Sequence, residues 1–241
     1  MKLAMVCPAL DEEGSVANVV AAFLLQSERL GHSARFIVAD NGSIDATKER
    51  AKDAGAVVVV EPLRGYGAAC LRGLRELQDE DAVVFVDADG ACDPADLQAL
   101  LAPLAWADLV IGSRITGAQV GRVDVGALTA GQRVGSVVAG VALRLLYGST
   151  SSDLGPFRAV RARALRELAL DDRGFGWTVQ MQARAARQGL RVVEVPVAWR
   201  RRRSGRSKIS GDLRASFSAG RIILRTLAHE LWRPGQARPP E

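Results

Sequence analysis

Two aspartates one residue apart, Asp87 and Asp89, follow the apolar run VVFV in the segment FVDADG. Carboxylates in this arrangement are typical ligands of Mg²⁺ or Mn²⁺, which take one or two carboxylates, waters and phosphate oxygens. Without a cation the two groups would repel each other and any diphosphate. With one, they can hold a diphosphate and stabilise charge on a leaving phosphate. The alternative is an ordinary acidic turn, because aspartate beside glycine is a common turn former.

A basic segment late in the chain supplies the opposite charge. The sequence RRSGRSK, residues 202–208, offers guanidinium groups and an ammonium on a glycine-containing loop, which suits phosphate binding. The wider basic cluster consists of Arg200, Arg201, Arg202, Arg203, Arg206 and Lys208. This cluster predicts an anionic partner, and the alternative is a solvated loop. Only 5% of the residues are aromatic, so stacking platforms are scarce and we expect no nucleic-acid partner.

Several other chemistries lack the residues that they need. The chain has no G-x-x-x-x-G-K loop and no G-x-G-x-x-G after its first expected strand, which argues against a dinucleotide oxidoreductase. Its histidines, His32 and His229, have no metal-ligand neighbours in sequence, which disfavours a histidine-centred hydrolase. The widely spaced Cys7, Cys70 and Cys92 indicate reduced, buried thiols and a cytoplasmic protein.

The sequence predicts that the protein does not span a membrane. A spanning helix needs about 18 uninterrupted apolar residues, and the nearest candidate, residues 134–148, is interrupted by Arg144. The apolar run at the N-terminus is too short for a secretory signal and is followed by acidic residues. We therefore expect contact with a membrane, if any, at its surface.

The first half of the chain alternates between short apolar runs and helical segments. The expected strands are residues 3–7, 34–40, 56–61, 82–89 and 107–114. This alternation predicts an α/β fold with a mostly parallel central sheet flanked by helices. The valine-rich run 56–61 predicts a strand that is buried on both faces. Ligands bind such sheets beyond the carboxyl ends of the strands, where Asp40, Glu61, Asp87 and Asp89 are expected.

Capping residues mark where two of the intervening helices begin. Ser43 is expected to cap a helix that ends at Gly55, where glycine favours termination. Asp93 is expected to cap a second helix, and Pro94 stands at its first helical position.

The second half of the chain is less regular than the first. A helical stretch near residues 126–147 precedes a polar loop, STSSDLGPF, and a further helical segment. A helix at 174–190 then leads into a strand at 191–200, where Pro196 indicates the edge of a sheet.

The last part of the chain predicts a basic amphipathic helix over residues 212–233. Leu213, Phe217, Leu224, Leu227 and Leu231 fall roughly on one face. The arginines and His229 fall on the other face. Such a helix either lies on an anionic membrane surface or packs on the domain with its arginines in water. We expect the tail, residues 234–241, to be disordered.

Taken in order, the motifs resemble those of the family 2 glycosyltransferases, which have the GT-A fold. CPALDEE is similar to the family's P-A-x-N-E-E opening, and VADNGSIDAT to its V-x-D-D-G-S-x-D-x-T. RGYGAA resembles R-G-x-G-A-A, FVDADGACDP resembles the D-A-D metal segment, and IGSR resembles G-S-R. The block that runs from GWTVQMQ to GRSKISG resembles the family's late R-x-x-G-x-S-K segment. The similarity covers about residues 3–211 and points to the polyprenyl-phosphate (dolichol-phosphate) mannosyl and glucosyl transferases.

The resemblance implies a nucleotide-sugar donor, a GDP- or UDP-hexose, and a Mg²⁺ or Mn²⁺ ion held by Asp87 and Asp89. Asp89 would be the main metal ligand. Asp40 would face the base of the nucleotide, and the basic residues would neutralise phosphates. The residues implied in donor binding are Pro8, Leu10, Glu12, Asp40, Asp87, Ala88, Asp89, Arg114, Arg202 and Lys208. The residues implied in catalysis are Asp89, Asp153 and Arg114.

The resemblance also implies a reaction that inverts the sugar by in-line displacement onto a polyprenyl phosphate. A phosphate acceptor is already anionic and needs no general base, whereas a hydroxyl acceptor requires a carboxylate to take its proton. Asp153 in SSDLGPF is the candidate by motif position, either as that base or as a group that orients the acceptor.

The expected organisation is one catalytic domain over residues 1–211. Its nucleotide-binding half would be residues 1–114, and its acceptor- and phosphate-binding half would be residues 115–211. The helix at 212–233 and the tail follow. With a lipid acceptor, the protein would be cytoplasmic and peripheral on the cytoplasmic face of the membrane.

Four positions depart from the family pattern. Asp11 stands where Asn is usual, and Asn41 replaces the second Asp of D-D-G-S. Ala91 follows the D-A-D-G where some relatives carry Gln near the metal. Gln180 stands where Glu is common, which argues against a catalytic carboxylate there.

Three other functions remain open from the sequence. The first is the same chemistry on a hydroxyl acceptor, such as a cell-envelope glycan or a small molecule. The second is a sugar-phosphate nucleotidylyltransferase, which needs a basic glycine-rich segment where this chain has the acidic PALDEE. The third is an inactive nucleotide-sugar-binding protein, against which the presence of Asp87, Asp89, Arg202 and Lys208 argues.

Overall fold

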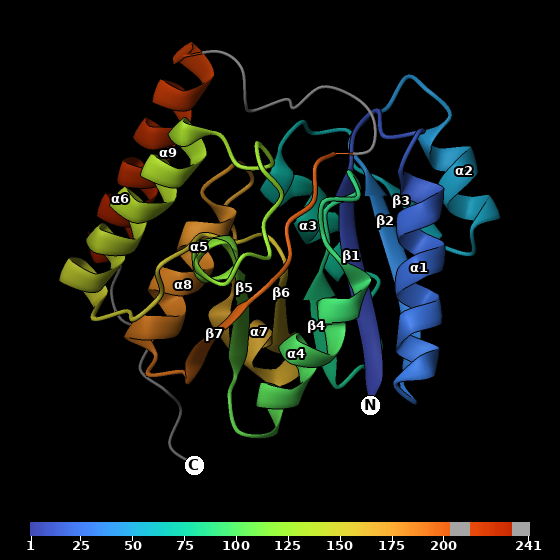
Figure 1. The fold of residues 1–241 in the computed structure, drawn as a ribbon, viewed down its shortest axis with the longest axis horizontal. Helices are drawn as coiled ribbons and strands as arrows, with labels where there is room; N and C mark the ends of the chain where they lie inside the picture. The colour runs from blue at the N-terminus through green and yellow to red at the C-terminus, as the bar shows by residue number, and fades with distance from the viewer. Residues whose placement is uncertain (203–212, 233–241) are drawn as a thin grey trace.

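A central sheet runs through the molecule, and helices cover both of its faces (Figure 1). The computed structural model describes residues 1–202 and 213–232, and in this part seven strands pair in the order β3-β2-β1-β4-β6-β5-β7. The strands are β1 (Lys2–Ala9), β2 (Ser33–Asp40), β3 (Val57–Val60), β4 (Ala82–Phe85), β5 (Leu109–Ser113), β6 (Arg158–Arg161) and β7 (Val192–Pro196). Every strand expected from the sequence is present, which confirms the α/β class.

The sheet is mostly parallel, as predicted, but one strand runs the other way. β1 pairs in parallel with β2 and β4, β2 with β3, and β5 with β7. β6 lies antiparallel between β4 and β5. The sequence did not reveal β6, because its four residues, RAVR, are too few to show a period and both of its partners are distant in sequence.

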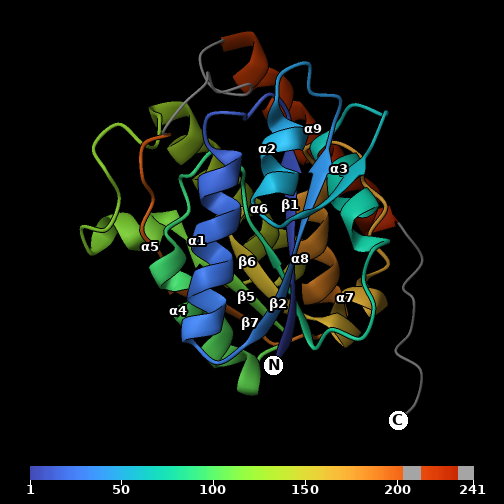
Figure 2. The same ribbon diagram turned by 90° about the vertical axis from the view of Figure 1, so that its right-hand side faces the viewer.

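The helices form a layer on each face of the sheet, and two of them form a further layer at one end (Figures 1 and 2). α1 and α4 pack on the face reached by Leu3, Met5 and Cys7. α3, α7 and α8 pack on the face reached by Ala4 and Val6. The helices are α1 (Val16–Arg29), α2 (Thr47–Asp53), α3 (Tyr66–Leu74), α4 (Leu97–Leu101), α5 (Arg114–Gln119), α6 (Ala130–Tyr147), α7 (Ala162–Leu168), α8 (Trp177–Arg187) and α9 (Leu213–Trp232), with 3-10 turns η1 (Pro94–Asp96) and η2 (Ala102–Ala105). α6 and α9 pack on each other and on α8.

This topology brings seven loops to one edge of the sheet. The parallel strands β1, β2, β3, β4, β5 and β7 all end there, and the antiparallel β6 begins there. The segments that carry the predicted chemistry are therefore neighbours, although they are spread over the chain from residue 8 to residue 202.

Two local expectations are wrong. The run at residues 56–61 forms β3, which lies at the edge of the sheet with Val57 and Val60 exposed, rather than buried on both faces. α2 begins at Thr47, so Ser43 does not cap it, and the Ser43 hydroxyl accepts from the Asp11 N–H instead. The cap at Asp93 is confirmed, because its carboxylate accepts from the Ala95 N–H at 3.0 Å.

The C-terminal helix docks on the domain with one flank. Leu227 is buried against α6 and α8, and the Tyr147 hydroxyl donates to the Leu227 carbonyl at 2.6 Å. Leu224 and Leu231 belong to the predicted apolar face but remain exposed. The prediction that the apolar face of this helix is buried and its basic face exposed to water is therefore not confirmed. Lys208, the loop around it and the expected disordered tail lie outside the described residues.

The cysteines and the membrane expectation can be checked directly. Cys7, Cys70 and Cys92 are free and buried, as predicted. Burial raises the pKa of each thiol, with nearby carboxylates adding to the effect. Among the described residues, no helix is long and apolar enough to cross a bilayer.

The glycines of RGYGAA serve packing between two backbones. At Gly67, an added Cβ would lie 2.1 Å from the Asp172 carbonyl oxygen. The Gly67 N–H donates to the Gly174 carbonyl at 3.0 Å, and the Ala68 N–H donates to the Arg173 carbonyl at 2.9 Å. The first turn of α3 is thus fixed against the segment before α8, and the N–H groups of Gly67 and Ala68 are used within the protein.

Gly67→Ala and Gly135→Ala test this close contact as a matched pair of helical substitutions. Gly67→Ala should destabilise the protein by about 1–3 kcal/mol, because the backbones must separate. Gly135 on α6 has no atom within 4 Å of its added Cβ, so alanine there should stabilise by about 0.5–1 kcal/mol. Urea unfolding of both variants measures the difference, and equal effects at the two sites would contradict the packing role.

Candidate active site

The aspartate pair lies at the carboxyl end of β4, where buried Val86 leads into the turn. Asp89 is buried, and its two oxygens have different partners. Oδ1 accepts from the Ala91 N–H at 2.9 Å, which closes the turn. Oδ2 accepts from Nε of Arg202 at 2.9 Å. One oxygen of Asp89 therefore closes the turn, and the other oxygen pairs with a guanidinium group.

Arg202 joins the start of the chain to this turn. Its guanidinium donates from Nε to Asp89 and from Nη2 to Oε1 of Glu12 at 2.8 Å. Its Nη1 is buried and has no hydrogen-bond partner among the described residues. Arg202 thus compensates two carboxylates that are 113 and 190 residues away. Nη1 carries two N–H donors to which an anionic ligand could bind.

Asp87 is the more weakly compensated member of the pair. Burial raises its pKa to about 7, and the negative charge of Asp89 adds to the shift, while Arg114 and Arg202 oppose it. The hydroxyl of Tyr66 donates to its Oδ1 over a long 3.4 Å. The site thus combines the carboxylates of Asp87, Asp89 and Glu12 around Arg202, an environment that suits a divalent cation.

The donor set fits Mg²⁺ or Mn²⁺ with a phosphate. In the described part of the chain, no three His, Cys, Asp or Glu side chains converge to enclose a metal. Mg²⁺ is commonly held by one or two carboxylates, waters and substrate phosphate oxygens rather than by a full protein cage. Asp87 and Asp89 match that pattern. Ala91 is buried and contributes no oxygen from its side chain.

A second arginine at the same edge is fully committed to a carboxylate. Arg114 follows β5 and donates from its backbone N–H, Nε and Nη2 to Asp153, at 2.8, 2.9 and 2.8 Å. Its guanidinium stacks on buried Trp199, 5.2 Å from the ring centre. It also donates to the Ser136 hydroxyl of α6 at 3.3 Å. Burial alone would raise the pKa of Asp153, but the Arg114 charge and hydrogen bonds bring the pKa below its ordinary value.

The loop that carries Asp153 is held by residues that the sequence did not single out. Glu194 on β7 accepts from the Ser152 and Asp153 N–H groups at 2.7 and 2.9 Å. It also accepts from the Ser152 hydroxyl. Burial raises the pKa of Glu194. Fully buried Arg158 donates to the Gly155 carbonyl, and burial lowers its pKa to about 10. Neither residue belongs to a local motif, so only the pairing of β6 and β7 into the sheet reveals them.

The loops after β1 and β2 form the other wall of the site. The Asp40 carboxylate is buried and accepts from the N–H groups of Gly42 and Ser43. Asp11 has a positive φ of 48°, which aspartate tolerates better than most residues, and its Oδ1 accepts from the Ile44 N–H. The loops after β1 and β2 are thus held together by hydrogen bonds within the protein.

Asn41 explains one departure from the family pattern. Its amide donates to the Glu61 and Leu63 carbonyls at 3.0 and 2.7 Å, and its oxygen accepts from the Gly65 N–H at 2.8 Å. An aspartate could not donate to the two carbonyls. Asn41 therefore holds the loop after β3 in place.

Gln180 explains another departure and lies outside the aspartate cluster. Its Oε1 accepts from the Asp171 and Asp172 N–H groups, and its Nε2 donates to Asp171 and to buried Glu230 of α9. Glu230 also pairs with Arg184 at 2.9 Å. A glutamate at position 180 would face two carboxylates, so the amide suits the docking of α9.

The remaining predicted residues fall into three groups. Pro8 and Leu10 are half-buried at the end of β1, and Ala88 is buried between the two aspartates. Arg200 pairs with Asp93 and Asp124, and Arg201 bonds the Val125 carbonyl, so these two members of the basic cluster act on the surface. Arg203, Arg206 and Lys208 lie outside the described residues.

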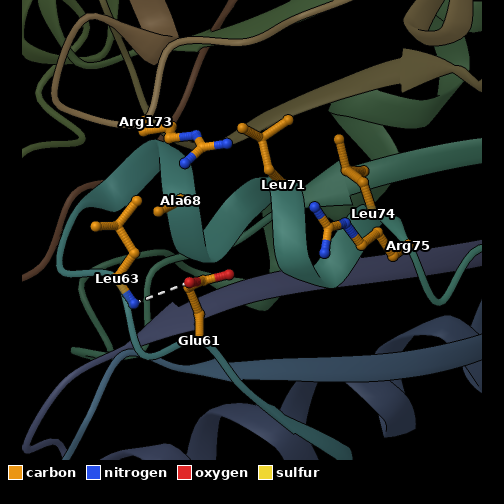
Figure 3. A pocket seen from close by; sticks show the side chains of 7 residues that line it. All are labelled: Glu61, Leu63, Ala68, Leu71, Leu74, Arg75 and Arg173. Carbon is orange, nitrogen blue, oxygen red and sulfur yellow. Dashed lines mark hydrogen bonds between the residues drawn. The ribbon is translucent and has the colours of Figure 1, made fainter.

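Glu61 faces a separate cavity of about 400 Å³ between the end of β3 and α3 (Figure 3). Its carboxylate accepts from the Leu63 N–H at 2.9 Å. The lining residues are Glu61, Leu63, Ala68, Leu71, Leu74, Arg75 and Arg173. None of the residues expected to bind the diphosphate lines this cavity, so Glu61 is not grouped with Asp87 and Asp89.

Comparison with known proteins gives the class of enzyme. The model of glycosyl transferase family 2 matches residues 5–169, and the chain belongs to this family. An uncharacterized glycosyltransferase of Mycobacterium tuberculosis is 39% identical over 216 residues, which cover 89% of this chain and 93% of that protein. The undecaprenyl-phosphate mannosyltransferase of Micrococcus luteus is 34% identical over 192 residues, covering 73% and 76% of the two chains. The protein is therefore an enzyme, a hexosyltransferase.

Solved structures confirm the GT-A fold. The glucosyl-3-phosphoglycerate synthase of Mycobacterium tuberculosis, in complex with Mn²⁺, UDP and glucosyl-3-phosphoglycerate, superposes with a TM-score of 0.74 at 25% identity. The match covers 98% of this chain and 81% of that one. The same synthase with Mg²⁺ and UDP gives a TM-score of 0.71. These neighbours are consistent with a divalent metal as cofactor.

Asp153→Asn tests the buried ion pair through its pH dependence. The pKa of Asp153 is lowered in the folded state, so its stabilisation is present above the unfolded pKa and is lost as the pH falls through the folded pKa. At pH 7 the variant should lose about 3–5 kcal/mol, because Arg114 stays buried without its counter-charge. The difference from wild type should shrink below the ordinary Asp pKa of 3.8. Urea unfolding between pH 7 and pH 3 measures it, and a difference that grows in acid would contradict the pairing.

Glu194→Ala and Glu194→Gln separate the hydrogen bonds of Glu194 from its charge. Alanine leaves the N–H groups of residues 152 and 153 without their acceptor and should cost about 1–3 kcal/mol. Glutamine retains an acceptor oxygen and can donate to the Ser152 hydroxyl, so it should remain within about 1 kcal/mol of wild type. Thermal and urea unfolding compare the two variants. A glutamine variant as unstable as the alanine variant would show that the charge itself is required.

Proposed function

We propose that this protein is a metal-dependent inverting glycosyltransferase that moves a hexose from a GDP- or UDP-hexose to a polyprenyl phosphate. The observation that carries the proposal is the cluster of Asp87, Asp89, Glu12 and Arg202, in which Nη1 of Arg202 has no partner within residues 1–202 and 213–232. Such a cluster suits a diphosphate that shares a cation with the aspartates and accepts from the arginine.

Each wall of the site has a proposed role in donor binding. Pro8, Leu10, Glu12 and Asp40 bind the nucleoside, with Asp40 facing the base. Ala88, whose side chain packs in the core, places its backbone beside the donor between the two aspartates. Asp87 and Asp89 hold Mg²⁺ or Mn²⁺, which supplies positive charge beside the departing diphosphate. Arg202 and Lys208 bind phosphate oxygens, and Arg114 contributes positive charge from the β5 end.

The pairing of Asp153 supports a phosphate acceptor over a hydroxyl acceptor. Both of its carboxylate oxygens already accept hydrogen bonds from Arg114, and its pKa is lowered. A general base works best with a pKa near the operating pH, so Asp153 is poorly suited to take a proton. A polyprenyl phosphate is already anionic and requires no such step. We assign Asp153 to holding Arg114 toward the acceptor side of the site.

The names of similar proteins also support a lipid acceptor. Similar proteins are named undecaprenyl-phosphate mannosyltransferase in Micrococcus luteus and polyprenol monophosphomannose synthase in Mycolicibacterium smegmatis. We accordingly propose residues 1–114 as the nucleotide-binding half and 115–211 as the acceptor half of one catalytic domain. The enzyme would act at the cytoplasmic face of a membrane as a peripheral protein.

A second candidate is transfer to a soluble hydroxyl acceptor. The structural neighbours that bind UDP are synthases of glucosyl-3-phosphoglycerate. Their fold covers 98% of this chain, so the same scaffold can serve a small acceptor.

A transfer assay separates the two acceptors. The enzyme is given labelled UDP-glucose, UDP-galactose or GDP-mannose with Mn²⁺, and either polyprenyl phosphate in detergent or 3-phosphoglycerate. We expect label to enter the organic phase with one donor, and Asp89→Asn to reduce this transfer at least about 100-fold. Asp93→Asn in the same loop is the matched control and should retain activity. Label only in the aqueous product would replace the lipid acceptor by the soluble one, and equal rates in Asp89→Asn would refute the metal role.

A further inference from the structure

The outward face of α6 is apolar and exposed. Val134, Val138, Val141 and Leu145 are 63%, 53%, 51% and 79% exposed. Their spacing of four, three and four residues places them in one line along the helix. Val137 and Leu146 beside them are also exposed. A surface helix of a soluble domain normally presents polar residues on this side.

This face is not needed to attach α6 to the domain. The opposite side of the helix buries Ser136, Ala139, Gly140 and Leu143. Gly140 lies against the loop before Asp153, where its added Cβ would be 3.1 Å from the Ser151 carbonyl oxygen. α6 is therefore already docked, and its outer valines and leucines are free for a partner. Contiguous exposed apolar surface of this kind marks interaction sites.

The neighbouring helix α9 also presents exposed apolar side chains. α9 packs alongside α6 (Figure 1) and leaves Leu224, Leu231 and Trp232 exposed. Tryptophan is enriched where proteins meet the interface between water and lipid, because its ring is apolar and its N–H is polar. The exposed leucines of the predicted C-terminal amphipathic helix thus adjoin a second exposed apolar helix.

The charges around these helices identify an anionic partner. Arg133 and Arg144 on α6, and Arg221 and Arg225 on α9, are exposed. α6 contains no acidic residue. In the part of α9 whose side chains are described, the acidic residue is Glu230, which is buried and paired with Arg184. A second copy of the chain is a poorer fit, because a twofold interface on this face would bring its arginines together.

We propose that the α6 face, with the exposed end of α9, docks on an anionic lipid bilayer. The valines and leucines enter the boundary between headgroups and acyl chains, and the arginines bind lipid phosphates. The buried side of α6 contacts the acceptor side of the site directly, through Ser136 and Arg114. Docking would therefore bring Arg114 and Asp153 within about one helix diameter, ~10–12 Å, of the lipid surface.

This inference rests on the proposed lipid acceptor for its purpose, but its test does not require transfer. Vesicles of phosphatidylglycerol and phosphatidylcholine, or of phosphatidylcholine alone, contain no polyprenyl phosphate and are mixed with the full chain without donor. We expect sedimentation with the anionic vesicles, weaker at 500 mM than at 50 mM salt, and little with the neutral ones.

Two matched double variants locate the surface. Val138→Glu/Leu145→Glu should lower the vesicle partition coefficient at least about tenfold, because two side chains no longer enter the lipid. Leu25→Glu/Val60→Glu replaces exposed residues on α1 and β3, at the other end of the molecule (Figure 1), and should bind as wild type. Equal melting temperatures confirm that both variants are folded.

Three results would overturn the proposal. The first is wild-type protein that ignores anionic vesicles. The second is binding that is unchanged in Val138→Glu/Leu145→Glu. The third is a concentration-dependent dimer in analytical ultracentrifugation that Val138→Glu/Leu145→Glu abolishes and Leu25→Glu/Val60→Glu retains. That result would assign the face to a second copy of the chain. Vesicle binding without any transfer to polyprenyl phosphate would uphold the docking surface while removing the proposed acceptor.

Discussion

Buried carboxylates at one edge of the sheet require guanidinium groups beside them, and this constraint organises the whole structure. An unpaired buried charge costs several kcal/mol, so Asp89, Glu12 and Asp153 are tolerated because Arg202 and Arg114 lie against them. The arginines come from the ends of β7 and β5, and the carboxylates from the loops after β1 and β4 and before β6. The strand order must therefore be right before any of these charges is compensated.

The two arginines are compensated to different extents, and this difference connects the structure to its chemistry. Arg114 is paired with Asp153 through two hydrogen bonds and stacks on Trp199, so it is a rigid positive group. Arg202 is divided between two carboxylates, and its buried Nη1 has no partner in the described part of the chain. Burial, with the negative charge of Asp89 added, raises the pKa of Asp87 to about 7. A diphosphate with a divalent cation would resolve both imbalances together.

The sequence was informative where the chemistry is local. The D-x-D pattern after VVFV, the cap at Asp93 and the edge character indicated by Pro196 each depend on a few adjacent residues, and all three lie in the structure as expected. The expectation failed at β3, because a valine-rich run looks the same whether it lies in the middle or at the edge of a sheet. It also failed for β6, whose place depends on partners about 50 to 80 residues away.

Other parts of the site could not be predicted because their meaning depends on distant backbone. The Asn41 amide matters only because the Glu61 and Leu63 carbonyls lie beside it, and Glu194 only because β7 brings it to residues 152 and 153. The glycines of RGYGAA allow the segment around Asp172 and Arg173 to approach closely, which no local pattern indicates. Asp40 and Asp89 are proposed to bind the donor, and each also accepts a hydrogen bond from an N–H group of its own turn.

The account's central claim is that Asp87 and Asp89 bind a diphosphate through a divalent cation. Isothermal titration of UDP and GDP, with Mn²⁺ and with EDTA, tests this claim most directly in wild-type protein and in Asp89→Asn. We predict that one nucleotide binds wild-type protein at least about tenfold more tightly with Mn²⁺, and that Asp89→Asn removes this dependence. A nucleotide that binds equally well in EDTA, or a metal dependence that survives in Asp89→Asn, would contradict it.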